Sequence, residues 1–175
     1  VAQGTIERTA LTDNVILRLQ AFQDKELDAL IEKHWGRTRP TPAELAQLIE
    51  RTRTALEQAP ASFLRGRKVF ENQRAKCHKF EGQGAEVGPA LDGAGRDIDY
   101  ILVNVLDPNR VIGAPYFVRT VVTHDDIVFQ GILAEEDDQS ITLKLEGGAF
   151  KTIRKANIAE VRIAEKSLMP EGLSN

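Results

Sequence analysis

The chain of 175 residues is poor in the residues that most often carry chemistry: it has one cysteine, one methionine, one tryptophan and three histidines. A single cysteine excludes an intramolecular disulfide, so cysteine content says nothing about the redox compartment. It also argues against a zinc site, because zinc takes about four ligands and the histidines are scattered. Any metal or cofactor chemistry must therefore depend on very few side chains.

Charge and hydrophobicity exclude further classes. The net charge is -3, with 28% charged and 6% aromatic residues, so we expect neither a nucleic-acid partner nor a disordered tail. The longest apolar runs, such as residues 127–129, fall far short of the ~20 residues of a membrane span. No signal peptide is visible, but the chain begins at Val1 without a methionine, so we expect a mature product or an excised fragment.

The first part of the chain has the apolar periodicity of helices. Helices are predicted at about residues 12–22, 24–34, 42–58, 62–74 and 97–106. Expected capping residues are Asp13 or Asn14, Thr41, Ser62 and Asp97. A turn is predicted at residues 37–42. Residues 59–62 interrupt the pattern, which indicates an N-terminal helical segment at residues 1–58 and a second unit at residues 59–175.

The period changes to that of strands after about Tyr116. Five short strands are predicted at residues 117–122, 127–133, 140–145, 150–153 and 158–163. Turn residues separate them, which is typical of a small antiparallel barrel or curled sheet. The sequence therefore predicts an α+β fold in which residues 114–165 form a β-strand insertion.

The only cysteine lies directly before one of the three histidines, as Cys77-His78. A c-type haem site is normally Cys-x-x-Cys-His, in which two thiols bond to the haem vinyl groups and the histidine binds the iron. Arg74 occupies the first thiol position. A bare Cys-His pair also occurs by chance, as a buried cysteine beside a surface histidine, so the pair alone does not decide between the two.

Two other stretches favour the haem interpretation. Gly88-Pro89-x-Leu91 follows His78 at a distance suited to placing a backbone carbonyl against the outer ring nitrogen, which fixes the tautomer and strengthens the ligand. Met169 precedes a proline in an otherwise polar terminal segment, where a packing role is hard to argue. Its thioether is a soft sixth ligand that raises the potential of haem iron. We therefore predict one haem c per chain.

Rival sites are weaker. His34 is expected at a helix end and His124 in a turn, so both are interpreted as structural. Gly82-x-Gly84 is not a phosphate loop, because no strand precedes it and no helix follows it. No Ser-His or paired-carboxylate spacing is present, and the acidic residues at 124–138 are interpreted as solvated turns. The sequence predicts no enzyme active site.

Several motifs are specific in combination, although no single one would suffice. They are Gly66-Arg67-x-Val69-Phe70, Ala75-Lys76-Cys77-His78-Lys79-Phe80, Val87-Gly88-Pro89-x-Leu91-x-Gly93, Leu106-Asp107-Pro108-Asn109 and Ser167-Leu168-Met169-Pro170-Glu171-Gly172-Leu173. With them, residues 62 to 173 resemble the haem-binding cytochrome c domain at the C-terminal end of large secreted proteins in planctomycetes and verrucomicrobia.

The resemblance implies a class I cytochrome c fold in which His78 and Met169 are the axial ligands and Cys77 is a thioether anchor. Both axial positions would then be filled, so the implied role is electron transfer to a redox partner protein, outside the cytoplasm and in bacteria in the periplasm. The domain would be part of a larger polypeptide or complex. The residues expected around the haem are Phe70, Val87, Leu91, Ile101 and Leu168, with Pro89 as the carbonyl partner.

The chain departs from the family at Arg74, so at most one thioether forms, as in certain protist mitochondrial cytochromes. Arg74 is expected to point to solvent rather than to pair with Glu71 or a haem propionate. The family also continues beyond Asn175 into a helix that packs on residues 62–74. Two alternatives stay open: a degenerate module without haem that docks partner proteins, and an enzyme with an open haem site if Met169 is not on the iron.

Overall fold

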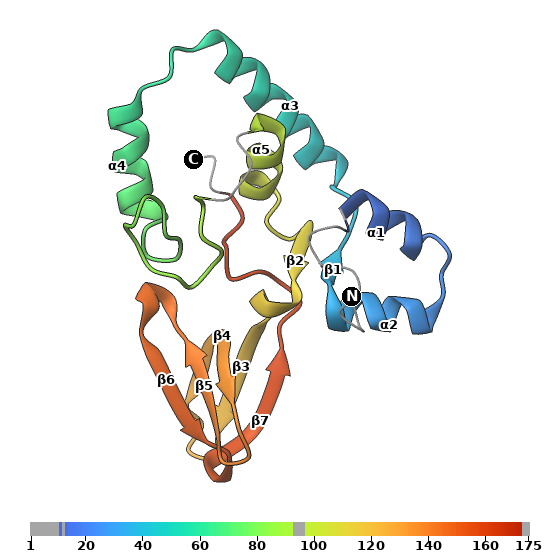
Figure 1. Cartoon of the computed structure of the whole chain (residues 1–175), viewed down its shortest axis with the longest axis vertical. Helices are drawn as coiled ribbons and strands as arrows, with labels where there is room; N and C mark the ends of the chain where they lie inside the picture. Colours follow the sequence, from blue (N-terminus) through green and yellow to red (C-terminus); the bar gives the residue numbers. More distant parts are fainter. Residues whose placement is uncertain (1–10, 12, 93–96, 173–175) are drawn as a thin grey trace.

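The computed structural model describes residues 11, 13–92 and 97–172, and within them the chain is α+β (Figure 1). Thr12, at the start of the first predicted helix, and Gly93, at the end of the motif that begins at Val87, lie outside the described residues. The side chains of the expected caps Asp13 and Asn14 also lie outside them. The α-helices of the described chain are α1 (Asp13–Gln20), α2 (Lys25–His34), α3 (Ala43–Gln58), α4 (Phe63–Gln73) and α5 (Ile98–Leu106). They follow the predicted helices closely.

The strands form one two-stranded and one five-stranded sheet. They are β1 (Gly36–Thr38), β2 (Val111–Gly113), β3 (Val118–Thr123), β4 (Val128–Glu136), β5 (Ser140–Lys144), β6 (Phe150–Arg154) and β7 (Ile158–Ile163). The larger sheet has the order β6-β5-β4-β3-β7 with antiparallel neighbours. β6 and β7 diverge from the turn that joins them (Figure 1), because β7 pairs with β3. The predicted antiparallel sheet is confirmed, and the closed-barrel alternative is wrong.

The five-stranded sheet has a hydrophobic core of its own. Val121, Ile141, Leu143 and Ile153 are buried together, and Phe129, Leu133, Leu145 and Ile158 pack against them. In β5 the buried side chains alternate with half-buried ones, which is the period of two expected when one face of a strand points into a core. These apolar residues of the sheet thus form one core among themselves.

Two of the expected helix caps are present and one is wrong. The side chain of Ser62 accepts the N–H of Arg65 at the start of α4, and Asp97 caps α5 in the same way. The N-cap of α3 is Pro42, in an extended conformation, with no side-chain cap bond. The expected cap at Thr41 is therefore displaced by one residue, because Pro42 precedes the first helical residue.

β1 and β2 pair two segments that lie far apart in the sequence, whereas the sequence predicted only a turn at residues 37–42. Gly36 has a φ of 137°, and a Cβ atom there would lie 2.2 Å from the carbonyl oxygen of Ile112. Only glycine allows this approach between the two backbones. The pairing has no local sequence pattern, which is why it was not predicted.

The N-terminal helical segment contacts later parts of the chain. α3 packs on α5 through a cluster that includes Ile49 and Leu106. The guanidinium of Arg37 lies 4.5 Å from the ring centre of Phe117, and it donates a hydrogen bond to the carbonyl of Ala164 at 2.8 Å. These contacts connect α3 to α5, and β1 to the end of the five-stranded sheet where β3 begins and β7 ends.

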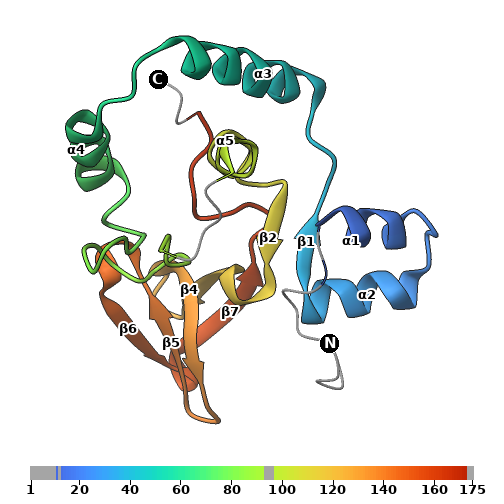
Figure 2. The same ribbon diagram turned by 45° about the horizontal axis from the view of Figure 1, so that its top comes forward.

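α4 is the least buried of the α-helices in the described residues. None of its residues is buried, and Phe63 and Leu64 are 70% and 73% exposed. Figures 1 and 2 both show α4 apart from α5, with residues 164–172 running between them.

Candidate functional site

The Cys77-His78 pair lies in a tight turn that follows α4. The helix ends at Gln73, and Arg74 donates its N–H to the carbonyl of Phe70 at 2.8 Å. The N–H groups of Cys77 and His78 both donate to the carbonyl of Arg74, at 2.9 and 2.8 Å. The end of α4 thus presents both side chains from one short segment.

The glycine-rich loop after His78 folds back over this turn. The N–H groups of Val87 and Gly88 both donate to the carbonyl of Cys77, at 3.0 and 2.7 Å. Gly84 has a φ of 98°, and a Cβ atom there would lie 2.2 Å from the carbonyl oxygen of His78. Glycine is therefore required where the loop crosses the turn.

The ring of His78 is fixed by the same loop. Its Nδ1 lies 2.8 Å from the carbonyl oxygen of Pro89, which is the contact that the sequence predicted. A carbonyl oxygen only accepts, so Nδ1 carries the hydrogen and Nε2 keeps its lone pair. A Cβ atom at Gly88 would lie 2.7 Å from the ring atom Cε1, so the loop also packs tightly on the ring. Nε2 is the ring nitrogen left to bind a metal.

The thiol of Cys77 is half-buried and free. It packs against a cluster formed by Val87, Val118 and Ile132, which joins the loop to the five-stranded sheet. Burial raises the pKa of the thiol and Glu146 adds to the rise, while nearby cations oppose it. Cys77 therefore stays protonated at neutral pH.

Arg74 occupies the position of the missing cysteine and is half-buried rather than fully solvated. Burial lowers the pKa of its guanidinium, and the Cys77 side chain opposes the shift. The expected alternative partner, Glu71, instead forms an ion pair with Arg67 at 2.8 Å. Arg74 thus lies beside Cys77 without the Glu71 contact.

The sheet also contacts this turn directly. The N–H of Gly147 donates to the carbonyl of Lys76 at 2.9 Å, and the ammonium of Lys144 donates to the carbonyl of Glu86 at 2.6 Å. Lys76 also forms an ion pair with Glu146. The β5–β6 end of the sheet therefore supports the backbone on both sides of Cys77.

Met169 lies in the C-terminal segment and is half-buried. Its neighbour Leu168 packs against the cluster of Val87, Val118 and Ile132 that Cys77 also contacts. Two parts of the predicted site, the Cys-His turn and the methionine segment, therefore share one hydrophobic cluster although they are far apart in the sequence.

The apolar residues expected around a haem differ in their burial. Val87 is buried, Phe70, Leu91 and Leu168 are half-buried, and Ile101 is exposed. Phe70 meets Phe80 edge to face, with ring centres 5.8 Å apart. Further large apolar side chains remain exposed on both helices: Phe63, Leu64 and Val69 of α4, and Ile98 and Tyr100 of α5. These side chains are apolar surface that each helix leaves uncovered.

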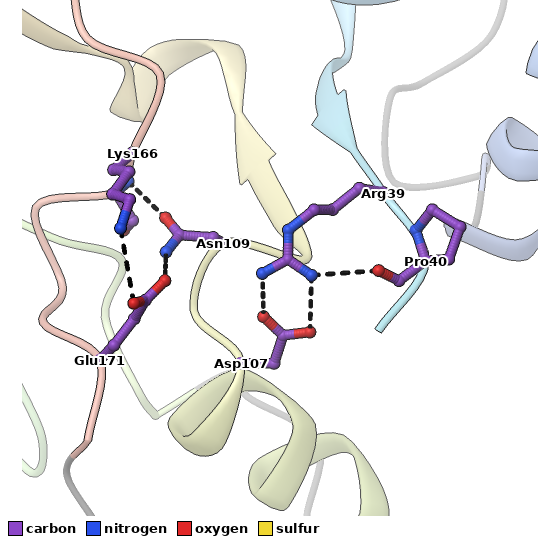
Figure 3. A network of polar contacts seen from close by, with 7 residues as sticks. Arg39, Pro40, Asp107, Asn109, Lys166 and Glu171 are labelled. Carbon is purple, nitrogen blue, oxygen red and sulfur yellow. Dashed lines mark hydrogen bonds and ion pairs between the residues drawn. The ribbon is translucent and has the colours of Figure 1, made fainter. Parts of the chain in front are cut away.

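A polar network beside the methionine segment was not predicted (Figure 3). Arg39 binds the carboxylate of Asp107 through two hydrogen bonds, at 2.6 and 3.2 Å. Asn109 accepts the N–H of Ser167 at 2.8 Å and donates to the carboxylate of Glu171. The motif Leu106-Asp107-Pro108-Asn109 entered the sequence analysis only among the motifs of the resemblance, although its two polar side chains were the available signal.

The rival ligands lie elsewhere. His34 ends α2, and His124 is exposed in the turn after β3. In the described part of the chain, no three His, Cys, Asp or Glu side chains gather as a possible metal site. This observation does not bear on haem, because a porphyrin supplies the equatorial nitrogens and the protein supplies only axial ligands.

Comparison with known proteins returned no match to any family model and none to the curated proteins. The helices within the described ranges are too short or too polar to cross a membrane. Ligation of iron by His78 and Met169 stays a prediction, as does the helical haem fold.

Proposed function

We propose that this chain is a c-type cytochrome domain that binds one haem and transfers electrons to a partner protein outside the cytoplasm. His78 and Met169 would hold the iron, and Cys77 would supply the single thioether. The proposal rests most on one observation, the fixed ring of His78, whose Nδ1 is engaged by Pro89 and whose Nε2 is available.

The residues present fit a haem in two further respects. Cys77 and Leu168 pack on one cluster, so the thioether anchor and the methionine segment approach the same region. The apolar side chains that α4 and α5 leave exposed, such as Phe63 and Ile101, are those that a porphyrin would cover.

Each residue has a definable role in this proposal. When bound, the haem would supply an iron that carries one electron between the ferrous and ferric states. The hydrogen bond from Nδ1 of His78 to Pro89 holds the tautomer and raises the basicity of Nε2. Met169 would fill the sixth position and raise the potential, and with both axial positions filled there is no site for a substrate.

The ligands are tested by a visible absorption spectrum of the purified protein together with the Met169→Ala variant. We expect a low-spin haem spectrum in the wild type and a high-spin or replaced-ligand spectrum in the variant. Leu168→Ala is the matched control, since it removes an apolar contact of the neighbouring residue and leaves the side chain of Met169 in place. A spectrum unchanged in Met169→Ala would remove Met169 from the proposal.

The attachment is tested by acid-acetone extraction and a pyridine haemochrome assay. Haem bonded through Cys77 stays with the protein, and Cys77→Ala releases it to the organic layer. The Arg74→Cys variant restores the two-cysteine motif, so the haemochrome band should move as a second vinyl group is saturated. A colourless wild-type protein that still folds would contradict the cytochrome proposal and favour the haem-free interaction module.

A further inference from the structure

Asn109 lies in the turn after α5 and contacts the methionine segment on both sides of Met169. Its Oδ1 accepts the N–H of Ser167 at 2.8 Å, and its Nδ2 donates to the carboxylate of Glu171 (Figure 3). Within the segment, the hydroxyl oxygen of Ser167 accepts the N–H of Met169 at 3.1 Å. One side chain thus connects two points that flank the only methionine.

The turn that carries Asn109 is itself firmly held. Asp107 is 1% exposed, and Arg39 satisfies its carboxylate with two hydrogen bonds. Pro108 is buried, and the N–H of Arg110 closes the turn on the carbonyl of Asp107 at 3.0 Å. Asn109 therefore projects from a fixed part of the fold.

The methionine segment has few such supports of its own. Residues 164–172 contain neither helix nor strand, and their bends leave Met169 half-buried. Ala164, at the start of the segment, is held by Arg37 and Val118. Closer to Met169, Leu168 supplies an apolar contact, and Asn109 supplies hydrogen bonds from outside the segment. A long thioether side chain on an irregular segment loses much conformational freedom when it is held in one place, so the contacts that limit the segment decide its position.

We propose that Asn109 is a positioning residue that holds Met169 in place as the sixth ligand of the iron. The inference rests on the proposed function. Without Asn109, the segment samples more conformations, and an added ligand displaces the methionine more easily. The expected effect is roughly a tenfold faster displacement, which is the ratio for the loss of one or two ordinary hydrogen bonds.

The test compares the wild-type protein with Asn109→Ala and with the control Asn104→Ala. Asn104 lies two residues before the end of α5, and its side chain donates to the carbonyl of Tyr100 within the same helix, at 2.8 Å. Two readouts are measured: the rate at which imidazole replaces the methionine in the ferric protein, and the amide exchange of Ser167 in the haem-free protein. Glu171→Ala, at an exposed position, keeps the bond between Asn109 and Ser167 but removes the bond from Asn109 to Glu171 and the ion pair of Glu171 with Lys166. It serves if Asn109→Ala folds poorly.

Faster imidazole binding and faster Ser167 exchange in Asn109→Ala, with wild-type rates in Asn104→Ala, support the role. Glu171→Ala should give a smaller change in the same direction. If the wild type shows methionine-bound haem and Asn109→Ala has the same displacement rate, the inference is overturned and the proposed function stands. If the wild type binds no haem through Met169, both the proposed axial pair and the inference fail.

Discussion

The five-stranded sheet and the helical region around α4 and α5 bury their apolar side chains in different ways. In the sheet, Val121 and Leu143 are 0% exposed and lie in one cluster with apolar residues of the same sheet and its turns. In the helical region, α4 buries no residue, and Tyr100 and Ile101 of α5 are exposed. The sheet therefore forms a core from its own strands, although Val128 and Phe150 stay exposed on it, whereas α4 buries no side chain and leaves its apolar surface for another group to cover.

This difference separates two sources of stability. The sheet should keep its stability whether or not a cofactor is present, because its core needs nothing else. The helical region should gain stability when the proposed haem binds, since a ligand that binds only the folded state stabilises it by mass action. Mutations in the two regions should consequently respond differently to haem.

The largest expected loss of stability is for a substitution in the core of the five-stranded sheet. Leu143→Ala should lower the free energy of unfolding by about 3–4 kcal/mol, because it leaves a cavity in a fully packed core. The loss should be equal in the haem-loaded and haem-free proteins, as measured by urea unfolding followed by circular dichroism. A loss that appears only with haem would mean that the sheet does not form its core independently.

A somewhat smaller effect is expected where the N-terminal segment meets α5. Arg39→Met should cost about 3 kcal/mol, because it leaves the carboxylate of Asp107, whose side chain is fully buried, without its counter-charge. Adding Asp107→Asn should recover much of this loss, since an amide is less costly to bury than a charge. Thermal unfolding of the single and double variants checks both. Additive losses would contradict the ion-pair explanation.

Gly88→Ala tests the packing of the glycine-rich loop on the ring of His78. The added Cβ would lie 2.7 Å from the ring of His78, so the ring must move away from Pro89. We expect about 1–2 kcal/mol of lost stability and a loss of low-spin haem in the visible spectrum. Gly66→Ala is the control, because no described atom lies within 4 Å of its Cβ position. Equal spectra for both variants would show that the His78 ring does not bind the iron.

The smallest effect concerns the thiol of Cys77. Burial raises its pKa, so in the haem-free protein the folded state keeps the proton at a pH where the unfolded thiol ionises. The protonated thiol therefore contributes to the stability of the folded state. This contribution to stability is complete below the ordinary thiol pKa and is lost as the pH rises through the raised pKa. Alkylation by iodoacetamide should accordingly need a higher pH than a free thiol does. A thioether cannot ionise, so haem-loaded protein should show no reaction at any pH.

Part of the candidate site was accessible from the sequence because it is local. Cys77, His78 and Pro89 lie within one short stretch, and glycines at 84 and 88 allow the loop to return to the histidine. The role of Asn109 was not accessible. Its partners Ser167 and Glu171 are separated from it by the whole five-stranded sheet, so no spacing rule connects them.

The local sequence was enough to predict the five helices, the strands of the larger sheet, and the caps at Ser62 and Asp97, because these depend on periodicity and on bonds between near neighbours. Only the tertiary structure decided that β1 pairs with β2, that the sheet stays open, and that the methionine segment shares a cluster with Cys77. Such contacts join segments that are far apart in the sequence, and they form only where the two surfaces fit well enough to offset the entropy lost when the intervening chain closes into a loop. No local sequence pattern reports that fit.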